Sequence, residues 1–180
     1  MSARRQPDRL TTGTFSRLYE EHLDAVFNYC LFRVGDRQLA EDVTAEVFEQ
    51  AWRDRRRYNP EQASFATWLF AIARHRVVDK QRQLGRRAGV ALDGQYEDKA
   101  PLPEEQLVRE ARQARLRDLM QTLPGDHREL IALKFGAGLT NRRIAELLDK
   151  SESAVGSAVY RVVQKLRQEW LETEEETDHE

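Results

Sequence analysis

The chain has 180 residues, 40% of them hydrophobic and 33% charged, and its formal net charge is −2 at pH 7. This balance is typical of a globular protein and argues against a disordered chain, and no apolar run approaches the ~20 residues that cross a bilayer. Because no apolar stretch follows the charged N-terminus, we expect no secretory signal and no membrane insertion, and predict a cytoplasmic protein. The single cysteine, Cys30, is predicted to be a core thiol rather than a redox or metal-binding residue.

The charges are unevenly distributed along the chain. The last twelve residues hold seven acidic side chains and no Lys or Arg, so the rest of the chain carries +5. Residues 53–87 contain ten cations and only three acids. A basic segment followed by an acidic end is the asymmetry expected of a phosphate-facing surface with a solvated tail, and an ordinary charged surface is the alternative.

Apolar residues recur at helical spacing through the first half of the chain. One predicted helix runs from Phe15 to Gly35, which ends it, and Asp36 is placed to cap the next helix. Pro60 then interrupts the pattern, and Ser64 is a suitable cap for a third helix that begins apolar and becomes rich in cations.

Gly and Pro punctuate residues 83–103, which show no sustained period and are typical of an interdomain linker. Helical spacing resumes over residues 107–123 and again from residue 126, and no segment predicts a strand of useful length. The predicted fold class is therefore all-α: two small helical domains joined by a flexible linker, the C-terminal one containing a helix-turn-helix.

The last two predicted helices form that helix-turn-helix. Thr140 caps a short helix over residues 141–148, and Ser151 or Ser153 caps a longer helix with an inward stripe of valines. A second helix of this kind fits the major groove of B-DNA and presents its outward residues to base edges. Plain packing within a helical bundle is the alternative.

Two further surfaces could carry function. Between Tyr58 and Arg82, aromatic residues are interleaved with cations, a combination that can stack unpaired bases and hold their phosphates, although several of the aromatic residues are also at core spacing. Asp42, Glu46 and Glu49 share one exposed helical face. This face is either merely solvated or a docking surface for a basic partner helix.

These pieces, in this order, resemble one family. Asp42 to Trp52 is similar to the segment by which extracytoplasmic-function (ECF) sigma factors hold core RNA polymerase. The stretch "RYNPEQASFATWLFAIARHRVVDKQRQ" resembles their promoter-melting segment, which reads the minus-ten element. The stretch "LPGDHRELIALKFGAGLTNRRIAELLDKSESAVGSAVYRVVQKLRQ" resembles their C-terminal domain, which reads the minus-thirty-five element.

The resemblance implies an initiation subunit that is not an enzyme and has no catalytic residue, metal, cofactor or small-molecule substrate. Its implied partners are core RNA polymerase, promoter DNA and an anti-sigma protein. The implied divisions are an N-terminal tail (1–13), a region 2-like domain (14–84), a linker (85–103), a region 4-like domain (104–170) and an acidic tail (171–180).

The resemblance also assigns roles to residues. The expected core-polymerase contacts are Asp42, Glu46, Phe48, Glu49 and Trp52. The expected minus-ten contacts are Tyr58, Asn59, Ser64, Arg74, Arg76, Lys80 and Arg82. The expected minus-thirty-five contacts are Arg142, Arg143, Ser157, Tyr160, Arg161 and Lys165.

The last helix departs from the family pattern. Asp149 and Lys150 stand where a Gly-Ile pair is usual, and Gly156, Ala158 and Val163 widen the apolar flank where cations are common. We therefore expect weak upstream-element affinity, improved by Gly156→Lys unless the flank packs against another helix. Two alternatives stay open: a helix-turn-helix regulator independent of polymerase, and a sigma-like protein-interaction module with weakened promoter reading.

Overall fold

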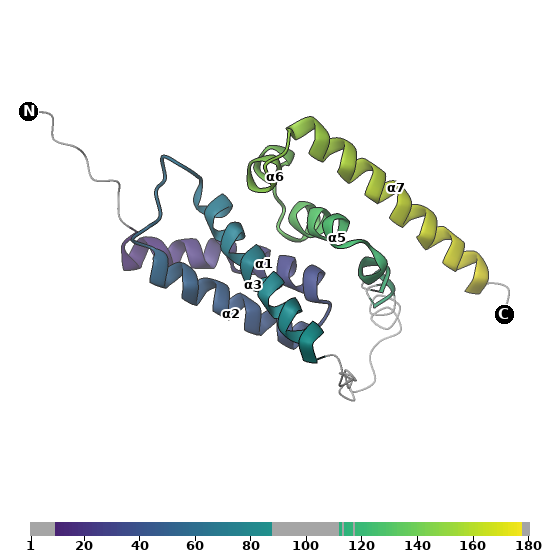
Figure 1. Cartoon of the computed structure of the whole chain (residues 1–180), viewed down its shortest axis with the longest axis horizontal. Coiled ribbons are helices and arrows are strands. Elements are labelled where there is room, and N and C mark those ends of the chain that lie inside the picture. Colours follow the sequence, from purple (N-terminus) through teal and green to yellow (C-terminus); the bar gives the residue numbers. More distant parts are fainter. Residues whose placement is uncertain (1–9, 88–111, 113, 117, 178–180) are drawn as a thin grey trace, which may run out of the picture.

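The computed structural model describes residues 10–87, 112, 114–116 and 118–177, and all regular structure in these ranges is helical, which confirms the all-α class (Figure 1). The first helical group comprises α1 (Thr12–Val34), α2 (Arg37–Asp54) and α3 (Phe65–Arg87). The second helical group comprises helical residues within 112–122, then α5 (Gly125–Ile131), the π-helix η1 (Ala132–Gly136), α6 (Asn141–Leu148) and α7 (Glu152–Thr177).

Side-chain caps fix where the helices begin, as the sequence predicts. Each capping oxygen accepts a hydrogen bond from the backbone N–H three residues later, which satisfies one of the donors left unpaired at a helix start. The capping residues of α2, α3, α6 and α7 are Asp36, Ser64, Thr140 and Ser151, at 2.6, 3.1, 3.3 and 3.2 Å from those nitrogens. Gly35 ends α1 with φ 78°, a left-handed conformation that glycine adopts without steric cost.

The first helical group encloses an apolar core. The predicted stripe of α2 is buried, with Val43, Val47 and Ala51 inaccessible to solvent, and it packs between α1 and α3. Val26 from α1 and Leu69 from α3 are equally buried in the same cluster. These apolar positions hold the exposed faces of α2 and α3 in fixed register.

Cys30 lies in this core and is fully buried, which confirms the expected core thiol. Burial raises the pKa of the Cys30 thiol to about 12, partly offset by a hydrogen bond to Thr44. Because the thiolate is the reactive species, we expect the native protein to resist a disulfide reagent such as DTNB at about pH 8 and to react at its single cysteine after unfolding. Rapid reaction of the native chain would contradict this burial.

The second helical group builds its helix-turn-helix around a tight turn. Asp149 ends α6 with φ 54°, in the left-handed region that glycine adopts most readily. Aspartate tolerates this conformation better than most residues, so the turn forms without glycine. Val162 of α7 packs with Met120 and Ile131 in a small cluster of its own, while Val155 joins the larger core.

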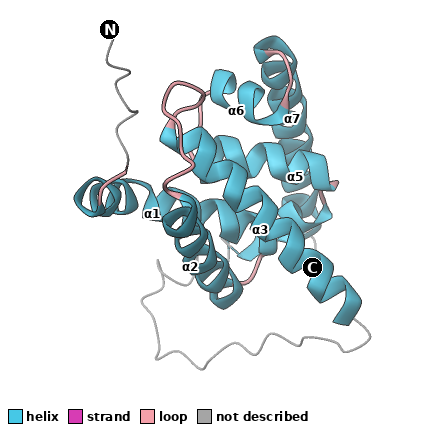
Figure 2. Cartoon of the chain, turned by 60° about the vertical axis from the view of Figure 1, so that its left-hand side comes forward, coloured by secondary structure: helices cyan, strands magenta, loops and turns pink. Residues whose placement is uncertain are grey.

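The two helical groups also pack against each other (Figures 1 and 2). The π-helix η1 lies on α1, and α6 lies against α3. At Gly136 an added Cβ would stand 3.0 Å from a ring carbon of Phe32 and 3.2 Å from both the Asn28 carbonyl oxygen and the Tyr29 Cα. This close approach joins buried side chains of both groups into one continuous core.

Three expected boundaries differ from the observed helices. The N-terminal tail was expected to end at residue 13, whereas Leu10 is buried and α1 begins at Thr12. Residues 85–87 of the expected linker are helical, and the remainder of that linker lies outside the described residues. The helix α7 continues through Thr177, into the segment expected to be a separate acidic tail.

Candidate nucleic-acid interface

The acidic face of α2 carries Asp42, Glu46 and Glu49, as the sequence predicts. Asp42 and Glu49 are exposed, and Glu46 is half-buried. Glu49 pairs with Arg53 one turn later, and Glu46 lies 3.6 Å from the ammonium of Lys80 on α3. Because exposed ion pairs are weak, these carboxylates can exchange their present partners for cations of another protein.

The two aromatic residues expected on that face are largely covered. Phe48 is 5% exposed and packs edge-on against Tyr19, with ring centroids 4.6 Å apart. The ring centroids of Trp52 and Phe15 are 5.0 Å apart, and the guanidinium of Arg55 lies 3.8 Å over the Trp52 ring. The carboxylates rather than these rings therefore form the accessible part of the surface.

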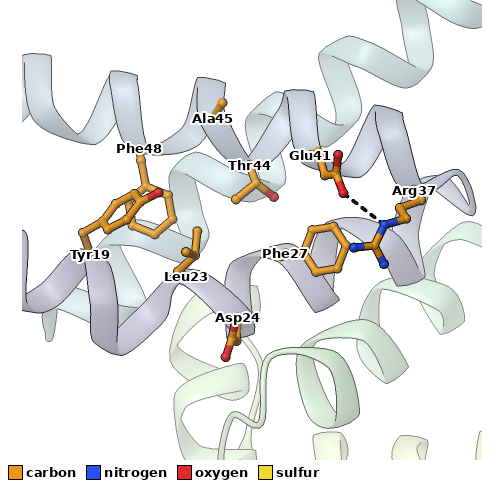
Figure 3. A pocket seen from close by; sticks show the side chains of 9 residues that line it. All are labelled: Tyr19, Leu23, Asp24, Phe27, Arg37, Glu41, Thr44, Ala45 and Phe48. Carbon is orange, nitrogen blue, oxygen red and sulfur yellow. Dashed lines mark ion pairs between the residues drawn. The ribbon is translucent and has the colours of Figure 1, made fainter.

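A shallow groove between α1 and α2 adjoins the acidic face and was not predicted (Figure 3). It has a volume of ≈ 300 Å³, and Tyr19, Leu23 and Phe27 supply its α1 wall. On the other side Arg37 pairs with Glu41 and lies 5.4 Å over the ring of Phe27. The i, i+4, i+8 spacing of the three apolar residues was the available signal, but helical spacing alone cannot tell a groove wall from a core stripe.

The loop before α3 is ordered by its own hydrogen bonds. The side-chain oxygen of Asn59 accepts from the Glu61 N–H at 3.0 Å, and Ser64 caps α3. The ring of Tyr58 is half-buried, with its centroid 5.7 Å from that of Phe65 and 5.2 Å from that of Trp68, and burial raises the pKa of its hydroxyl. The Tyr58 ring is therefore held in place by its aromatic neighbours, and only part of it is accessible to a base.

The cations of α3 do not form an open row. Arg74 donates to Glu129 at 3.0 Å and to the Leu147 carbonyl at 3.1 Å, so it lies at the junction of the two helical groups. Arg76 donates to the side-chain oxygen of Gln50 at 2.6 Å. Lys80 lies beside Glu46, so Arg74, Arg76 and Lys80 all have protein partners in this arrangement. Arg82 lies on the exposed surface of α3.

The outward face of α7 is accessible along its length. Tyr160 is 65% exposed, and Ser157, Arg161 and Lys165 are also exposed. On α6, Arg142 pairs with Glu146, and Arg143 is exposed. Arg143 also acts on α1: burial lowers the pKa of His22, the charge of Glu21 partly opposes this, and the charge of Arg143 lowers the pKa further.

The small-residue flank of α7 is partly covered by other helices of the chain. An added Cβ at Gly156 would meet a single neighbour within 4 Å, the side-chain nitrogen of Asn141 on α6, at 3.3 Å. Ala158 and Val163 are half-buried against the apolar clusters. The absence of a side chain at Gly156 therefore lets α6 and α7 lie close together at the start of the helix-turn-helix.

Replacing Gly156 by alanine tests how tight this approach is. We expect Gly156→Ala to raise the unfolding free energy by up to ~1 kcal/mol, the helix-propensity gain, because the amide of Asn141 can move by a few tenths of an ångström. Gly85→Ala on α3, which has no neighbour within 4 Å, is the matched control and should show the full gain. Urea unfolding measures both, and a destabilised Gly156→Ala would show that the amide is fixed.

Comparison with known proteins assigns both helical groups. Residues 18–87 match the family model "Sigma-70 region 2", and residues 113–166 match "Sigma-70, region 4". The ECF RNA polymerase sigma factor ShbA of Streptomyces griseus is 34% identical over 149 residues, which cover 77% of this chain and 78% of ShbA. The chain belongs to the ECF family of RNA polymerase sigma factors.

Other ECF sigma factors extend the comparison. BldN of Streptomyces coelicolor is 31% identical over 84% of this chain, and the matched part spans 58% of the length of BldN. Two solved structures share the fold: the sigma factor RpoE in complex with the anti-sigma factor NepR from Bartonella quintana (TM-score 0.67, 20% identity, 86% and 94% coverage) and CnrH in complex with the cytosolic domain of CnrY (TM-score 0.64, 23% identity, 88% and 88% coverage).

The two family matches show which sigma-factor region contains each candidate surface. The acidic face of α2 and the cations of α3 lie in region 2, and the exposed face of α7 lies in region 4. ECF sigma factors are transcription factors rather than enzymes. Across the ranges that the structure describes, no helix combines the length and apolarity needed to span a bilayer.

Proposed function

We propose that this ECF sigma factor binds core RNA polymerase through the acidic face of α2 and directs it to promoters through α3 and α7. The observation that carries the proposal is the exposed outward face of α7, with Tyr160 and Arg161 at its centre, in a chain that also carries the exposed carboxylates of region 2. A helix of this kind can enter the major groove while the α2 face contacts a basic protein surface.

The division of labour follows from the contacts of each surface. Arg142, Arg143, Ser157 and Lys165 are exposed beside the groove-facing residues and are suited to phosphate and base contacts on the minus-thirty-five duplex. Around Tyr58 and Asn59 the ordered loop is suited to one unstacked base of the minus-ten element, whose extrusion costs a few kcal/mol. In this proposal the chain catalyses no reaction of its own and acts in the cytoplasm.

An anti-sigma protein is the partner that would restrain this activity. Two solved sigma factors of the same fold are bound to anti-sigma proteins, NepR and the cytosolic domain of CnrY. The groove between α1 and α2, which borders the proposed polymerase face, gives such a partner an apolar surface next to the residues it would have to cover. Binding there would compete directly with polymerase.

Transcription in vitro tests the proposed function. Purified core polymerase is mixed with genomic fragments, with and without the protein, and transcript starts are mapped. We expect new start sites that require the protein. If no start site appears while the protein binds core polymerase, the chain is an interaction module; if it binds specific duplex DNA without polymerase and yields no transcripts, it is an independent helix-turn-helix regulator.

A further inference from the structure

Glu129 of α5 is a buried carboxylate at the junction of the two helical groups. It is 7% exposed, and its three side-chain partners all come from region 2. The hydroxyl of Tyr29 donates to it at 2.9 Å, and the Nε atoms of Arg33 and Arg74 lie 2.9 and 3.0 Å from its two oxygens. A buried carboxylate needs such partners, so this side chain favours the packed arrangement of the groups over a separated one.

The partners of Glu129 also make backbone contacts across the same junction. Arg33 donates to the Gly125 carbonyl at 3.2 Å, and Arg74 donates to the Leu147 carbonyl at 3.1 Å. Each arginine therefore holds region 4 at two points, once through the carboxylate of Glu129 and once through a carbonyl at a helix end. In this arrangement, two arginines of region 2 are paired with groups of region 4.

The apolar part of the junction reinforces these polar contacts. Gly136 of η1 allows the π-helix to lie directly on α1, where any larger side chain would meet backbone atoms of Asn28 and Tyr29. On the region 2 side, the ring of Phe70 packs edge-on against that of Tyr29, with centroids 5.6 Å apart, and so supports the residue that η1 meets. Gly136 belongs to the packing between the groups, and the neighbours of an added Cβ include the Cα of Tyr29, whose hydroxyl donates to Glu129.

We propose that Glu129 is a latch that holds region 4 against region 2 in the free chain and withdraws Arg74 from single-stranded DNA. The latch does not cover α7, whose Tyr160 and Arg161 stay exposed in the same arrangement. In the free chain, Arg74 is therefore withheld from single-stranded DNA, while the face of α7 remains accessible to duplex DNA. This regulation rests on the proposed role of Arg74 in holding the minus-ten strand, and binding of polymerase or of the strand must break the latch.

Two variants open the latch by different routes. Glu129→Gln removes the charge that pairs both arginines and keeps the side-chain volume. Arg33, whose side chain is 6% exposed, then regains water only when the groups separate, whereas Arg74 is already 35% exposed. Gly136→Leu keeps Glu129, Arg33 and Arg74 and inserts a side chain between η1 and α1, against the backbone of Asn28 and Tyr29. Gly85→Leu, at a position with no neighbour within 4 Å, is the matched control for adding a leucine.

Opening is measured on the full-length free chain by small-angle X-ray scattering, which needs neither polymerase nor DNA. We expect a larger radius of gyration for Glu129→Gln and Gly136→Leu and no change for Gly85→Leu. If both opening variants keep the radius of the unsubstituted chain while remaining folded by circular dichroism, the latch does not exist. A transcription assay that fails would reject the proposed function and leave this scattering result standing.

Withdrawal of Arg74 is measured with a labelled single-stranded DNA of mixed sequence. Both opening variants should bind it roughly tenfold more tightly, as expected when a closed state that predominates is removed. Binding of a mixed-sequence duplex, which uses the exposed face of α7, should stay the same. Adding Arg74→Ala to Gly136→Leu should abolish the gain; if the gain persists, or if opening brings none, Arg74 is not the residue that the latch withholds.

Discussion

Glu46→Arg combined with Glu49→Arg is expected to weaken the binding of core RNA polymerase about 10–100-fold, because the substitutions turn attraction for a basic partner into repulsion. Both carboxylates lie on the outer face of α2, where Glu49 pairs with Arg53 and Glu46 with Lys80. These surface pairs contribute little to folding, so the fold should survive the change. The dissociation constant is measured without DNA, so that promoter contacts do not enter.

The control for this experiment carries the same change of charge elsewhere. Glu152→Arg with Glu172→Arg reverses two exposed carboxylates on α7, far along the chain from α2. We expect polymerase binding to this variant to be close to that of the unsubstituted chain. Equal losses in both variants would indicate a general charge effect, and no loss in the α2 variant would remove α2 as the docking face.

Local features of the fold were predictable from the sequence because they depend on neighbours within one turn. Asp36, Ser64 and Thr140 cap the helices that they were expected to cap, and the predicted short helix from residue 141 to 148 has the observed bounds. Each cap needs only a side-chain oxygen and the N–H three residues later. Such contacts form wherever the helix forms, whatever the rest of the chain does.

Features that depend on distant contacts were not predictable in this way. Helical spacing places Phe48 beside an exposed face of α2. It does not predict that Tyr19 of α1 covers the Phe48 ring. Arg74 reads as a cation on an amphipathic helix, and only the fold brings Glu129, 55 residues later, against it. Periodicity reports which face of a helix is apolar, but it does not report which element covers the other faces.

Gly156 is intermediate between the features that the sequence predicts locally and those that depend on distant contacts. Its departure from the family pattern was visible in the sequence, and two interpretations were left open: packing within the domain and packing on a partner. The neighbour at 3.3 Å is Asn141 of α6, so the packing at this position is internal. We therefore expect affinity for the upstream duplex to depend on the outward face of α7 and not on this flank.

Arg161→Ala combined with Lys165→Ala is expected to weaken promoter-duplex binding by the polymerase complex roughly 10–100-fold. Both side chains are exposed one turn apart on α7, and the ion pair of Lys165 with Glu169, at 3.5 Å, is too weak to hold the ammonium away from a phosphate. A base contact by Arg161 is worth ~1–3 kcal/mol, and loss of one phosphate contact lowers the salt dependence of binding by about one unit.

The salt dependence of DNA binding distinguishes base-specific contacts from non-specific electrostatic attraction. Arg17→Ala with Arg37→Ala removes two exposed cations from α1 and α2 and is the control for the loss of charge. If α7 reads the major groove, its double variant should lose more affinity for the promoter duplex than for a scrambled duplex. The slope of its binding constant against salt should also fall. The control should keep its promoter affinity and its salt slope. Unchanged promoter affinity in the α7 variant would mean that neither cation contacts the promoter duplex. Arg161 and Lys165 are the Arg and Lys residues of α7 between residues 157 and 165.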